Sequence, residues 1–523
     1  MFKKVITILI TFLALILIST QLSLPAYAEN EFIIDANVDY KVNNDGITEI
    51  SHNTTLENAF STIYATSYTL ALENINTSNI RAFQGNTELT VEETKKDNLT
   101  LIKVIFPNNL IGKGKSRIFS IVFEADDFAS RTGEVWEVSI PRLANSDSFR
   151  DYNATVYVPT SFGFESYISP DPITKNENKD YRIYTFSKDL IKDSPIQAGF
   201  GKFQIFNFKL NYHLENPLNE FAETTIPLPP DTSFQKVYYE TIDPLPKDIK
   251  RDPDGNWLAT YKLKPRERID VSASGNVQIF SSEHTVFVRS EENLQNNLVG
   301  NEFWTVDSEI ITSIAQTLNG PKEIYDYVID TLSYDYERVR PNIQRLGAQE
   351  ALKNPTSAIC MEFTDLFITL SRASGIPARE INGYAYTENP EIQPLSLVAD
   401  VLHSWPEYWD ETRGVWIPVD PTWGDTTDGL DYFDKLDLRH FTFVVHGEDA
   451  SKPYAPGSYK LGPNPQKDVY VSFGKLPSKR DAVVNLDANV SKNFPYLNTV
   501  VTLSIENEGP IALYDVTLSL IHI

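Results

Sequence analysis

The sequence predicts a multidomain chain with all-β sandwich-type modules first, an α+β domain next and a partial β module last. Its 523 residues are too many for one hydrophobic core. Residues 29–287 consist mostly of short runs rich in Val, Ile, Tyr, Phe and Thr, separated by turn residues. Apolar residues at helical spacing begin only near residue 305. These changes of pattern set the predicted domain boundaries.

Residues 1–28 are predicted to be a secretory signal peptide. Two lysines precede an apolar stretch (Val5 to Ile18), and residues 26–28 have the small-x-small pattern of a cleavage site. The stretch is short for a membrane span of about 20 residues, so cleavage near Ala28 is favoured over an uncleaved anchor. No cysteine lies near the site, which excludes lipoprotein processing. We therefore expect an extracytoplasmic protein, either secreted or held at the cell surface.

The composition is acidic. Lys and Arg number 46 while Asp and Glu number 71, which gives a net charge of −25 at pH 7. A chain of this charge is repelled by nucleic acid and by anionic lipid surfaces, so neither is a predicted partner. Hydrophobic residues make up 41% of the chain, which is ordinary for folded domains and excludes wholesale disorder.

Two β-rich regions follow the signal peptide. In residues 29–200, the alternating runs 32–42 and 47–56 flank an Asp-Gly turn, as in a β-hairpin, and similar runs recur. We expect one or two sandwich modules in this region. Residues 195–201 are rich in turn residues, so a second β module is predicted for residues 201–290.

Residues 296–450 are predicted to form an α+β domain. Periodicity indicates helices over 308–318, 321–332 and 356–374, followed by strands over 379–386, 398–409 and 415–419. The last helix has the clearest pattern, with apolar residues at i, i+3, i+4 and i+7. Helices followed by antiparallel strands are typical of the α+β class.

The end of the sequence contains a predicted linker and an incomplete module. Residues 451–480 are loop-like and rich in proline and glycine. Alternating runs resume in residues 481–523 and resemble the opening of an immunoglobulin-like sandwich, which usually needs about seven strands. We therefore expect the chain to continue beyond residue 523, where a membrane anchor would have room.

Cys360 is the one cysteine of the sequence, so an internal disulfide is excluded. It lies in the first turn of the helix predicted to begin near Thr356. Unpaired N–H groups and the dipole at a helix start favour the thiolate, the form that attacks carbonyls. Free cysteine is also often buried as a packing residue. Its position alone does not separate these two interpretations.

His403 and Asp420 are predicted to face each other across a hairpin. Residues 402–409 and 415–420 alternate as strands around a short loop. If the hairpin is centred between residues 411 and 412, His403 lies opposite Asp420, with Cβ atoms about 5 Å apart. The carboxylate could then hold the imidazole tautomer while the other ring nitrogen faces a thiol. A register that slips by one residue is the alternative.

These residues lie in motifs that resemble the bacterial transglutaminase-like family, within the papain-like cysteine peptidase and transglutaminase superfamily. The motifs are AICMEF at 358–363, SRASGIPAR at 371–379, Gly383-Tyr384, His403-Ser404-Trp405 and WIPVDPT at 416–422. The resemblance covers roughly residues 300–450. It implies a papain-like fold, in which a nucleophile helix packs on an antiparallel sheet, with Cys360, His403 and Asp420 as the catalytic triad.

Two features expected from the resemblance are not matched directly. Ala358 stands where many members have glycine, and its methyl group could narrow access to the thiol. A second oxyanion donor is expected upstream of the cysteine, and Tyr334, Gln344 and Trp304 are the candidates. Each of the three is also readily explained as a packing or surface residue.

No metal or cofactor is predicted. Five aspartates recur at three-residue spacing from Asp425 to Asp437, but this spacing does not match an EF-hand loop and suits solvated carboxylates or helix caps. His440 and His446 flank an apolar strand and lack a Cys/His ligand set.

The sequence predicts a thiol acyl-transfer enzyme acting through a thioester on amide bonds of proteins or peptides, peptidoglycan peptides included. Hydrolysis is favoured over cross-linking because water is abundant and no amine site is evident in the sequence. A transglutaminase forming isopeptide bonds is the first alternative. A non-enzymatic surface protein, whose β modules bind a cell-surface partner, is the second, and the intact triad argues against it. The oligomeric state is not predicted.

Overall fold

The computed structural model describes residues 31–284, 291–340, 343–387, 389–395, 400, 402–427, 430–433, 436–462, 466–493 and 498–513. The predicted signal peptide and residues 514–523 of the predicted C-terminal module lie outside these residues. The chain divides into two compact units. One contains residues 50–124 and 145–154 with the segment that ends at Asp39, and the other contains residues 40–49, 125–144 and 155–523. The predicted domain boundaries stay predictions.

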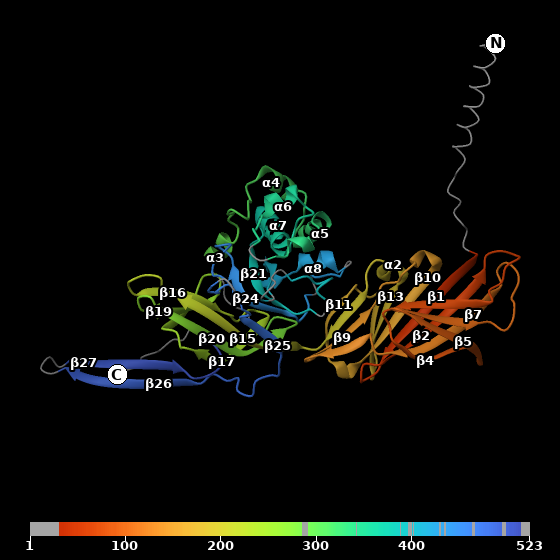
Figure 1. Ribbon diagram of the computed structural model, residues 1–523, viewed down its shortest axis with the longest axis horizontal. Helices are drawn as coiled ribbons and strands as arrows, with labels where there is room; N and C mark the ends of the chain where they lie inside the picture. Colours follow the sequence, from red (N-terminus) through yellow and green to blue (C-terminus); the bar gives the residue numbers. More distant parts are fainter. Residues whose placement is uncertain are drawn as a thin grey trace, which may run out of the picture. The chain divides into compact units, whose positions relative to one another are not determined.

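The first unit is all β (Figure 1). Its strands are β1 (Phe32–Val42), β2 (Thr48–Asn58), β3 (Ser67–Glu73), β4 (Thr77–Gln84), β5 (Thr87–Lys96), β6 (Leu99–Ile105) and β7 (Ser116–Ala125). They lie in the sheet order β1-β2-β7-β4-β5-β6-β3, so the hairpin predicted around the Asp-Gly turn is present as β1 and β2. Alternate residues of β7, such as Phe119 and Phe123, are buried, as expected for a strand with one covered face.

The chain between β7 and residue 201 forms more strands and short helices, which the two units share. They are β8 (Ala129–Thr132), β9 (Val135–Ile140), η1 (Ser146–Ser148), β10 (Phe149–Pro159), η2 (Thr160–Phe162), β11 (Glu165–Ser169), β12 (Thr174–Glu177), β13 (Tyr181–Ser187), α2 (Lys188–Ile191) and β14 (Ile196–Phe200). Strands β11, β14, β9 and β8 form a four-stranded sheet in that order. Arg439 donates to Glu137 of β9 at 2.9 Å, which ties this sheet to the α+β region.

The second β region forms two facing sheets with a shared hydrophobic core. Its strands are β15 (Phe203–Glu215), β16 (Ala222–Leu228), β17 (Gln235–Asp243), β18 (Asp248–Arg251), β19 (Trp257–Leu263) and β20 (Arg268–Phe280). The sheet orders are β17-β20-β15-β25 and β16-β19-β18, where β25 is Val469–Phe473. Leu210, Ile226 and Val277 are among the buried residues between them.

The segment predicted as a linker is therefore more than a linker. Within residues 451–480, β25 pairs antiparallel with β15, from Val469 opposite Leu210 to Phe473 opposite Phe206. The physical reason is that the free edge of β15 offers unpaired backbone groups, which the alternating residues of β25 satisfy. The C-terminal region then forms the hairpin β26 (Val484–Asn493) and β27 (Asn498–Asn507). Two strands leave the predicted immunoglobulin-like module unconfirmed.

The α+β region has a small sheet with helices on one side (Figure 1). Its helices are α3 (Glu291–Asn296), α4 (Glu309–Ala315), α5 (Pro321–Thr331), η3 (Tyr336–Arg338), α6 (Ala348–Lys353), α7 (Cys360–Ala373) and α8 (Pro421–Thr426). Its strands are β21 (Ala378–Ala385), β22 (His403–Asp410), β23 (Val415–Pro418) and β24 (His440–His446), in the order β23-β22-β21-β24. Phe363, Phe367 and Leu370 of α7 enter a core shared with Tyr408 of β22.

The nucleophile helix begins later than predicted. The predicted start was Thr356, whereas α7 begins at Cys360. The preceding residues form a turn and a bridge instead: Ser357 donates to the carbonyl of Asn354 at 3.0 Å, Ser333 donates to that of Pro355 at 2.8 Å and Asp335 donates to that of Ala358 at 2.7 Å. These hydrogen bonds compete with the helix, and they place the cysteine at its first residue.

The hairpin register also differs from the prediction. Asp410 pairs with Val415 and Glu407 pairs with Pro418, which is a shift of two residues from the predicted register. The turn explains the shift, because Thr412 and Arg413 donate their N–H groups to Asp410 Oδ1 and Gly414 has a φ of 65°. A shift of two keeps every side chain on its predicted face.

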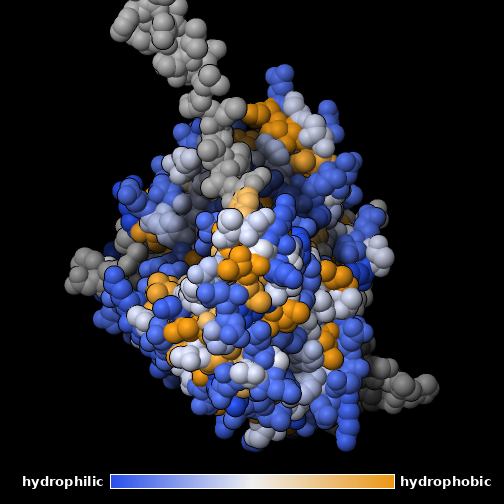
Figure 2. Space-filling model, turned by 90° about the vertical axis from the view of Figure 1, so that its right-hand side faces the viewer, coloured by the Kyte–Doolittle hydropathy of each residue, from blue (hydrophilic) through white to orange (hydrophobic). Residues whose placement is uncertain are grey.

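The surface fits the acidic, polar composition. On the face shown in Figure 2, hydrophobic residues form scattered patches separated by hydrophilic ones. No helix among the described residues is long and apolar enough to cross a bilayer.

Candidate active site

Cys360 is the first residue of α7 and is fully buried. The first N–H groups of a helix have no partner within it, so they surround the thiol with donors. Glu362, also fully buried, accepts a hydrogen bond from the Ile359 N–H at 3.0 Å and another from the Leu346 N–H at 2.9 Å. This capping fixes the helix start, and with it the position of the thiol.

His403 is the first residue of β22 and is also buried. Its ring lies against Trp405 and Trp423, with centroid distances of 6.0 and 5.2 Å. Gly383 lies opposite it on β21, where a Cβ atom would come within 2.2 Å of the Phe441 carbonyl oxygen and 2.5 Å of the Trp405 ring. Glycine is therefore required for β21 to pack this closely behind the histidine.

Asp420 is the N-cap of α8, and both of its carboxylate oxygens are engaged. Oδ1 accepts hydrogen bonds from the N–H groups of Thr422 and Trp423 at 3.0 and 3.1 Å. Oδ2 lies 2.9 Å from His403 Nε2 and 3.2 Å from His440 Nε2. The helix cap holds the carboxylate in place although Asp420 lies outside the strand predicted to carry it.

The charges of His403 and Asp420 stabilise each other. Burial alone would lower the pKa of His403, but the charge and hydrogen bond of Asp420, together with the nearby Cys360 side chain, raise it to about 9. Burial would raise the pKa of Asp420, but His403 and the hydrogen bonds from His403 and His440 hold it well below its usual range. The pair therefore favours an imidazolium beside a carboxylate.

The two nitrogens of His403 face different partners. Nε2 faces Asp420, whereas Nδ1 is buried and has no hydrogen bond of ordinary geometry within the described part of the chain. Cys360 is close enough to the ring to raise the pKa of His403 through hydrogen bonding and charge. The structure thus brings together the three residues singled out from the sequence, and leaves one ring nitrogen of His403 without an ordinary hydrogen bond among the described residues.

A family model described as the Transglutaminase-like superfamily matches residues 305–421, which include Cys360, His403 and Asp420. The chain contains a transglutaminase-like domain. The chain as a whole is β-rich, and in this domain the helix that carries the cysteine packs against an antiparallel sheet.

Curated relatives match this domain over short stretches. A protein-glutamine gamma-glutamyltransferase of Pseudomonas aeruginosa is 36% identical over 78 residues, which are 15% of this chain and 12% of the relative. An uncharacterised protein of Mycobacterium tuberculosis is 30% identical over 97 residues, which are 16% of this chain and 31% of the relative. The chain thus spans an eighth to a third of the length of the curated relatives it matches.

A solved structure of a proposed cysteine protease from Cytophaga hutchinsonii covers 61% of this chain and 93% of its own length. It is 15% identical, with a TM-score of 0.34.

The three candidates for a second oxyanion donor in the transglutaminase-like domain are separated by their contacts. The Trp304 indole donates to Asp365 at 2.8 Å in the core, and Gln344 is exposed. Tyr334 forms a parallel bridge with Ala358, and its buried hydroxyl has no hydrogen-bond partner among the described residues. Burial and the nearby Cys360 raise the pKa of Tyr334 well above its usual value. Tyr334 is therefore the candidate that lies beside the thiol.

His440 belongs to the site, although no local pattern in the sequence places it there. It begins β24 and contacts Asp420 through Nε2 at 3.2 Å and Asp437 through Nδ1 at 2.8 Å. His403, Asp420 and His440 offer ligand atoms within 4.8 Å of one another, a set that could hold a metal ion. The expectation that His440 lacks ligand-type neighbours is therefore wrong, because β24 pairs with β21 and so lies near β22. The absence of a metal stays a prediction.

Proposed function

We propose that this protein is a thiol acyl-transfer enzyme with Cys360 as nucleophile, His403 as acid and base, and Asp420 as the residue that orients His403. The observation that carries the proposal is the position of the His403 ring, with Nε2 on a fixed carboxylate and Nδ1 left for the cysteine. A buried histidine whose second nitrogen lacks a partner is unusual in a structural role, because unpaired buried polar atoms are costly.

The geometry supports a two-step reaction. Cys360 as thiolate attacks an amide carbonyl carbon, and the tetrahedral intermediate collapses as His403 gives its Nδ1 proton to the departing amine. Water then attacks the thioester, and His403 takes a proton from this water. The resulting tetrahedral intermediate collapses, which releases the acid and restores the thiolate and the imidazolium. Asp420 remains ionised throughout because its four hydrogen-bond donors favour the carboxylate form.

The oxyanion of the intermediate needs donors, and two are available next to the thiol. The N–H group of Cys360 lies at the start of α7, where helix N–H groups have no intrahelical partner. The Tyr334 hydroxyl is buried without a partner beside the same residue. We assign the Tyr334 hydroxyl as the second donor, since a raised pKa keeps it protonated and able to donate.

Hydrolysis is favoured over cross-linking. Cys360, His403 and Asp420 are each at most 1% exposed. Water reaches a buried thioester more readily than the amine of a second protein does. We therefore propose a protease or amidase acting on protein or peptide substrates, peptidoglycan peptides included. A transglutaminase that forms isopeptide bonds is the alternative. The signal-like start of the sequence supports action outside the cytoplasm.

The first test measures the alkylation rate of Cys360 by iodoacetamide at neutral pH. We expect the native protein to react faster than the urea-unfolded chain, and His403→Ala to remove most of this advantage. His213→Ala is a matched control, because the ring of His213 contacts Asp270 and Asp468 on another sheet. If native Cys360 reacted no faster than the unfolded thiol and His403→Ala changed nothing, the protein would be a non-enzymatic surface protein instead.

A second test separates hydrolase from transferase. Peptide libraries are offered with and without a labelled primary amine, and products are identified by mass. The proposal predicts hydrolysis products in both arms. Amine incorporation that is lost in Cys360→Ala would show that the transglutaminase alternative is correct.

A further inference from the structure

His440 is a buried histidine that the proposed reaction does not use. Both of its ring nitrogens are engaged with carboxylates, since Nδ1 lies 2.8 Å from Asp437 Oδ1 and Nε2 lies 3.2 Å from Asp420 Oδ2. The side chains of His440, Asp437 and Asp420 are 2%, 4% and 0% exposed. Solvent therefore contributes little to satisfying any of these groups.

This geometry requires a charged ring. An ionised carboxylate only accepts hydrogen bonds, and a neutral imidazole has one donor. A neutral His440 would turn a lone pair toward one of the two carboxylates, whereas an imidazolium donates to both. The same direction follows from the pKa of His440, which burial would lower but which the two aspartates raise to about 9.

The charged groups form a continuous row. With the thiol ionised, Cys360, His403, Asp420, His440 and Asp437 alternate as negative, positive, negative, positive and negative. His403 and His440 share the same oxygen atom of Asp420, and their ring centroids are 5.8 Å apart. Asp437 is itself held by the N–H group of Arg439 at 3.0 Å.

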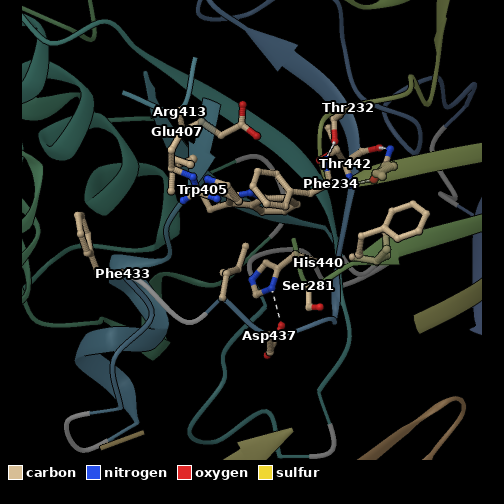
Figure 3. Close-up of a pocket in the computed structure, with 16 residues that line it drawn as sticks. Thr232, Phe234, Ser281, Trp405, Glu407, Arg413, Phe433, Asp437, His440 and Thr442 are labelled. Carbon is tan, nitrogen blue, oxygen red and sulfur yellow. Dashed lines mark hydrogen bonds and ion pairs between the residues drawn. The ribbon is translucent and has the colours of Figure 1, made fainter. Parts of the chain in front are cut away.

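The outer end of this row borders a cavity, whereas the cysteine is not among the residues that line it. His440 and Asp437 line a cavity of about 110 Å³ together with Trp405, as Figure 3 shows. Three titratable groups face His440 directly: Asp437, Asp420 and His403. Two more charged groups lie along the cavity wall, where Glu407 is paired with Arg379 and Arg413 is paired with Glu283. The groups on the wall are already neutralised by their own partners, so Asp437 and Asp420 determine the charge of His440.

We propose that His440, held as an imidazolium by Asp437, is a positioning residue that fixes Asp420 against His403 and weakens the hold of Asp420 on the His403 proton. The inference rests on the proposed triad and adds a second histidine-carboxylate pair behind it. The hydrogen bond from His440 to Asp420 Oδ2 fixes the position of the carboxylate. The positive charge of His440 disfavours a second positive charge on His403, on the other side of the same carboxylate.

The hydrogen bond and the charge of His440 act on His403 in different ways, and substitutions can separate them. In His440→Gln, the amide nitrogen occupies the position of Nε2, so a donor to Asp420 is kept while the charge is lost. In His440→Ala, both are lost. Removal of the charge alone lets Asp420 attract the His403 proton more strongly, so His403 should lose its proton at a higher pH.

The experiment is the pH dependence of Cys360 alkylation by iodoacetamide in the full chain. In the wild type, we expect a fast rate at neutral pH and a further step near pH 9, where His403 loses its proton; His403→Ala should lack the fast rate at neutral pH and show only the single step of an ordinary thiol, near about pH 8.5. In His440→Gln, the step should move up by at least about half a pH unit. His213→Gln is the matched control, because His213 also lies between two carboxylates but does not contact Asp420, and its step should stay in place.

The outcomes separate the two proposals. If the wild type shows the fast rate at neutral pH and His403→Ala loses it, but the step near pH 9 does not move in His440→Gln, the role of His440 is refuted while the triad stands. If the alkylation rate has no step that depends on His403, the triad itself is refuted. If His440→Gln lowers the unfolding temperature but leaves the step in alkylation rate at the same pH, His440 has only a structural role, and this would also overturn the inference.

Discussion

Two histidines of this protein lie between pairs of aspartates, and their surroundings differ. His440 lies between Asp420 and Asp437, where all three side chains are at most 4% exposed. His213 of β15 lies between Asp270 and Asp468, but its side chain is 29% exposed and that of Asp270 is 81% exposed. The hydrogen-bond pattern is the same, while the access of water is not.

The difference shows that burial decides what such a cluster does. Water can replace the exposed Asp270, and Asp468, whose side chain is 4% exposed, also receives Lys460 at 3.0 Å, so the loss of one contact is easily compensated. At His440, a lost contact leaves a buried carboxylate with a missing donor. The exposed cluster is a surface ion pair, whereas the buried one can fix the geometry and charge of a reacting group.

The largest contrast is expected from alanine substitutions of the two histidines. His440→Ala should lower the free energy of unfolding by about 3 kcal/mol, because Asp420 and Asp437 lose a charged donor in the core. His213→Ala should cost less than about 1 kcal/mol, because water replaces the ring. Urea unfolding at pH 7 measures both values. Equal losses in the two variants would show that burial does not distinguish the clusters.

Tyr334 provides a second contrast, between two neighbouring tyrosines. Tyr334→Phe should lower kcat for amide hydrolysis about 10- to 100-fold, because the oxyanion loses a donor. The alkylation rate of Cys360 should stay the same, since that reaction forms no oxyanion. Tyr336→Phe is the control, because the Tyr336 ring is exposed and its hydroxyl donates to the carbonyl of Glu391. Unchanged kcat in Tyr334→Phe would remove Tyr334 from the reaction.

The pH dependence of stability gives a third contrast. The pKa of His440 is raised from 6.5 to about 9, so its contribution is fully present below about pH 6.5 and is lost as pH rises through 9. His403 behaves in the same way. The free energy of unfolding of the wild type should therefore fall between pH 6.5 and 9, with up to about 3 kcal/mol from each histidine.

In His440→Gln, the fall in stability over this pH range should be smaller by roughly the contribution of one histidine. His213→Gln should change the slope little, because solvent screens its aspartates. Urea unfolding at several pH values checks this. A slope in His440→Gln equal to that of the wild type would mean that His440 does not carry the charge assigned to it.

The smallest contrast is between Asp437, which contacts His440, and Asp270, which contacts His213. Asp437→Asn keeps a side chain of the same shape but removes the charge that holds the His440 proton, and we expect a loss of about 1 to 2 kcal/mol in unfolding free energy at pH 7. Asp270→Asn should change it by no more than a few tenths of a kcal/mol. The contrast fails if the two variants unfold at the same urea concentration.

Local patterns in the sequence identify the nucleophile helix, the hairpin and the triad candidates. They do so because Cys360, His403 and Asp420 lie in or next to elements with strong periodicity and recognisable motifs. They misplace the start of α7 by four residues, because hydrogen bonds from Ser333 and Asp335 engage the carbonyls of Pro355 and Ala358 outside the helix. Such bonds join separate segments and leave no local pattern.

The hairpin register and His440 show the same limit. The register depends on Asp410, whose side chain accepts hydrogen bonds from the N–H groups of the turn. Asp410 is therefore the last paired residue of its strand and not part of the loop. His440 meets Asp420 only because β24 joins the sheet through β21, with His440 opposite Ala385. That pairing brings together residues that are far apart in the sequence, so no local pattern predicts the contact between His440 and Asp420.

Acylation with p-nitrophenyl acetate measures whether His403 activates Cys360 for acyl transfer. We expect a rapid burst of one equivalent of p-nitrophenol per chain, with one acetyl group found on the peptide that contains Cys360. The burst should be absent in Cys360→Ala and slower by about 100-fold or more in His403→Ala. A wild-type burst that persists in Cys360→Ala, or one that is equally fast in His403→Ala, would contradict the account.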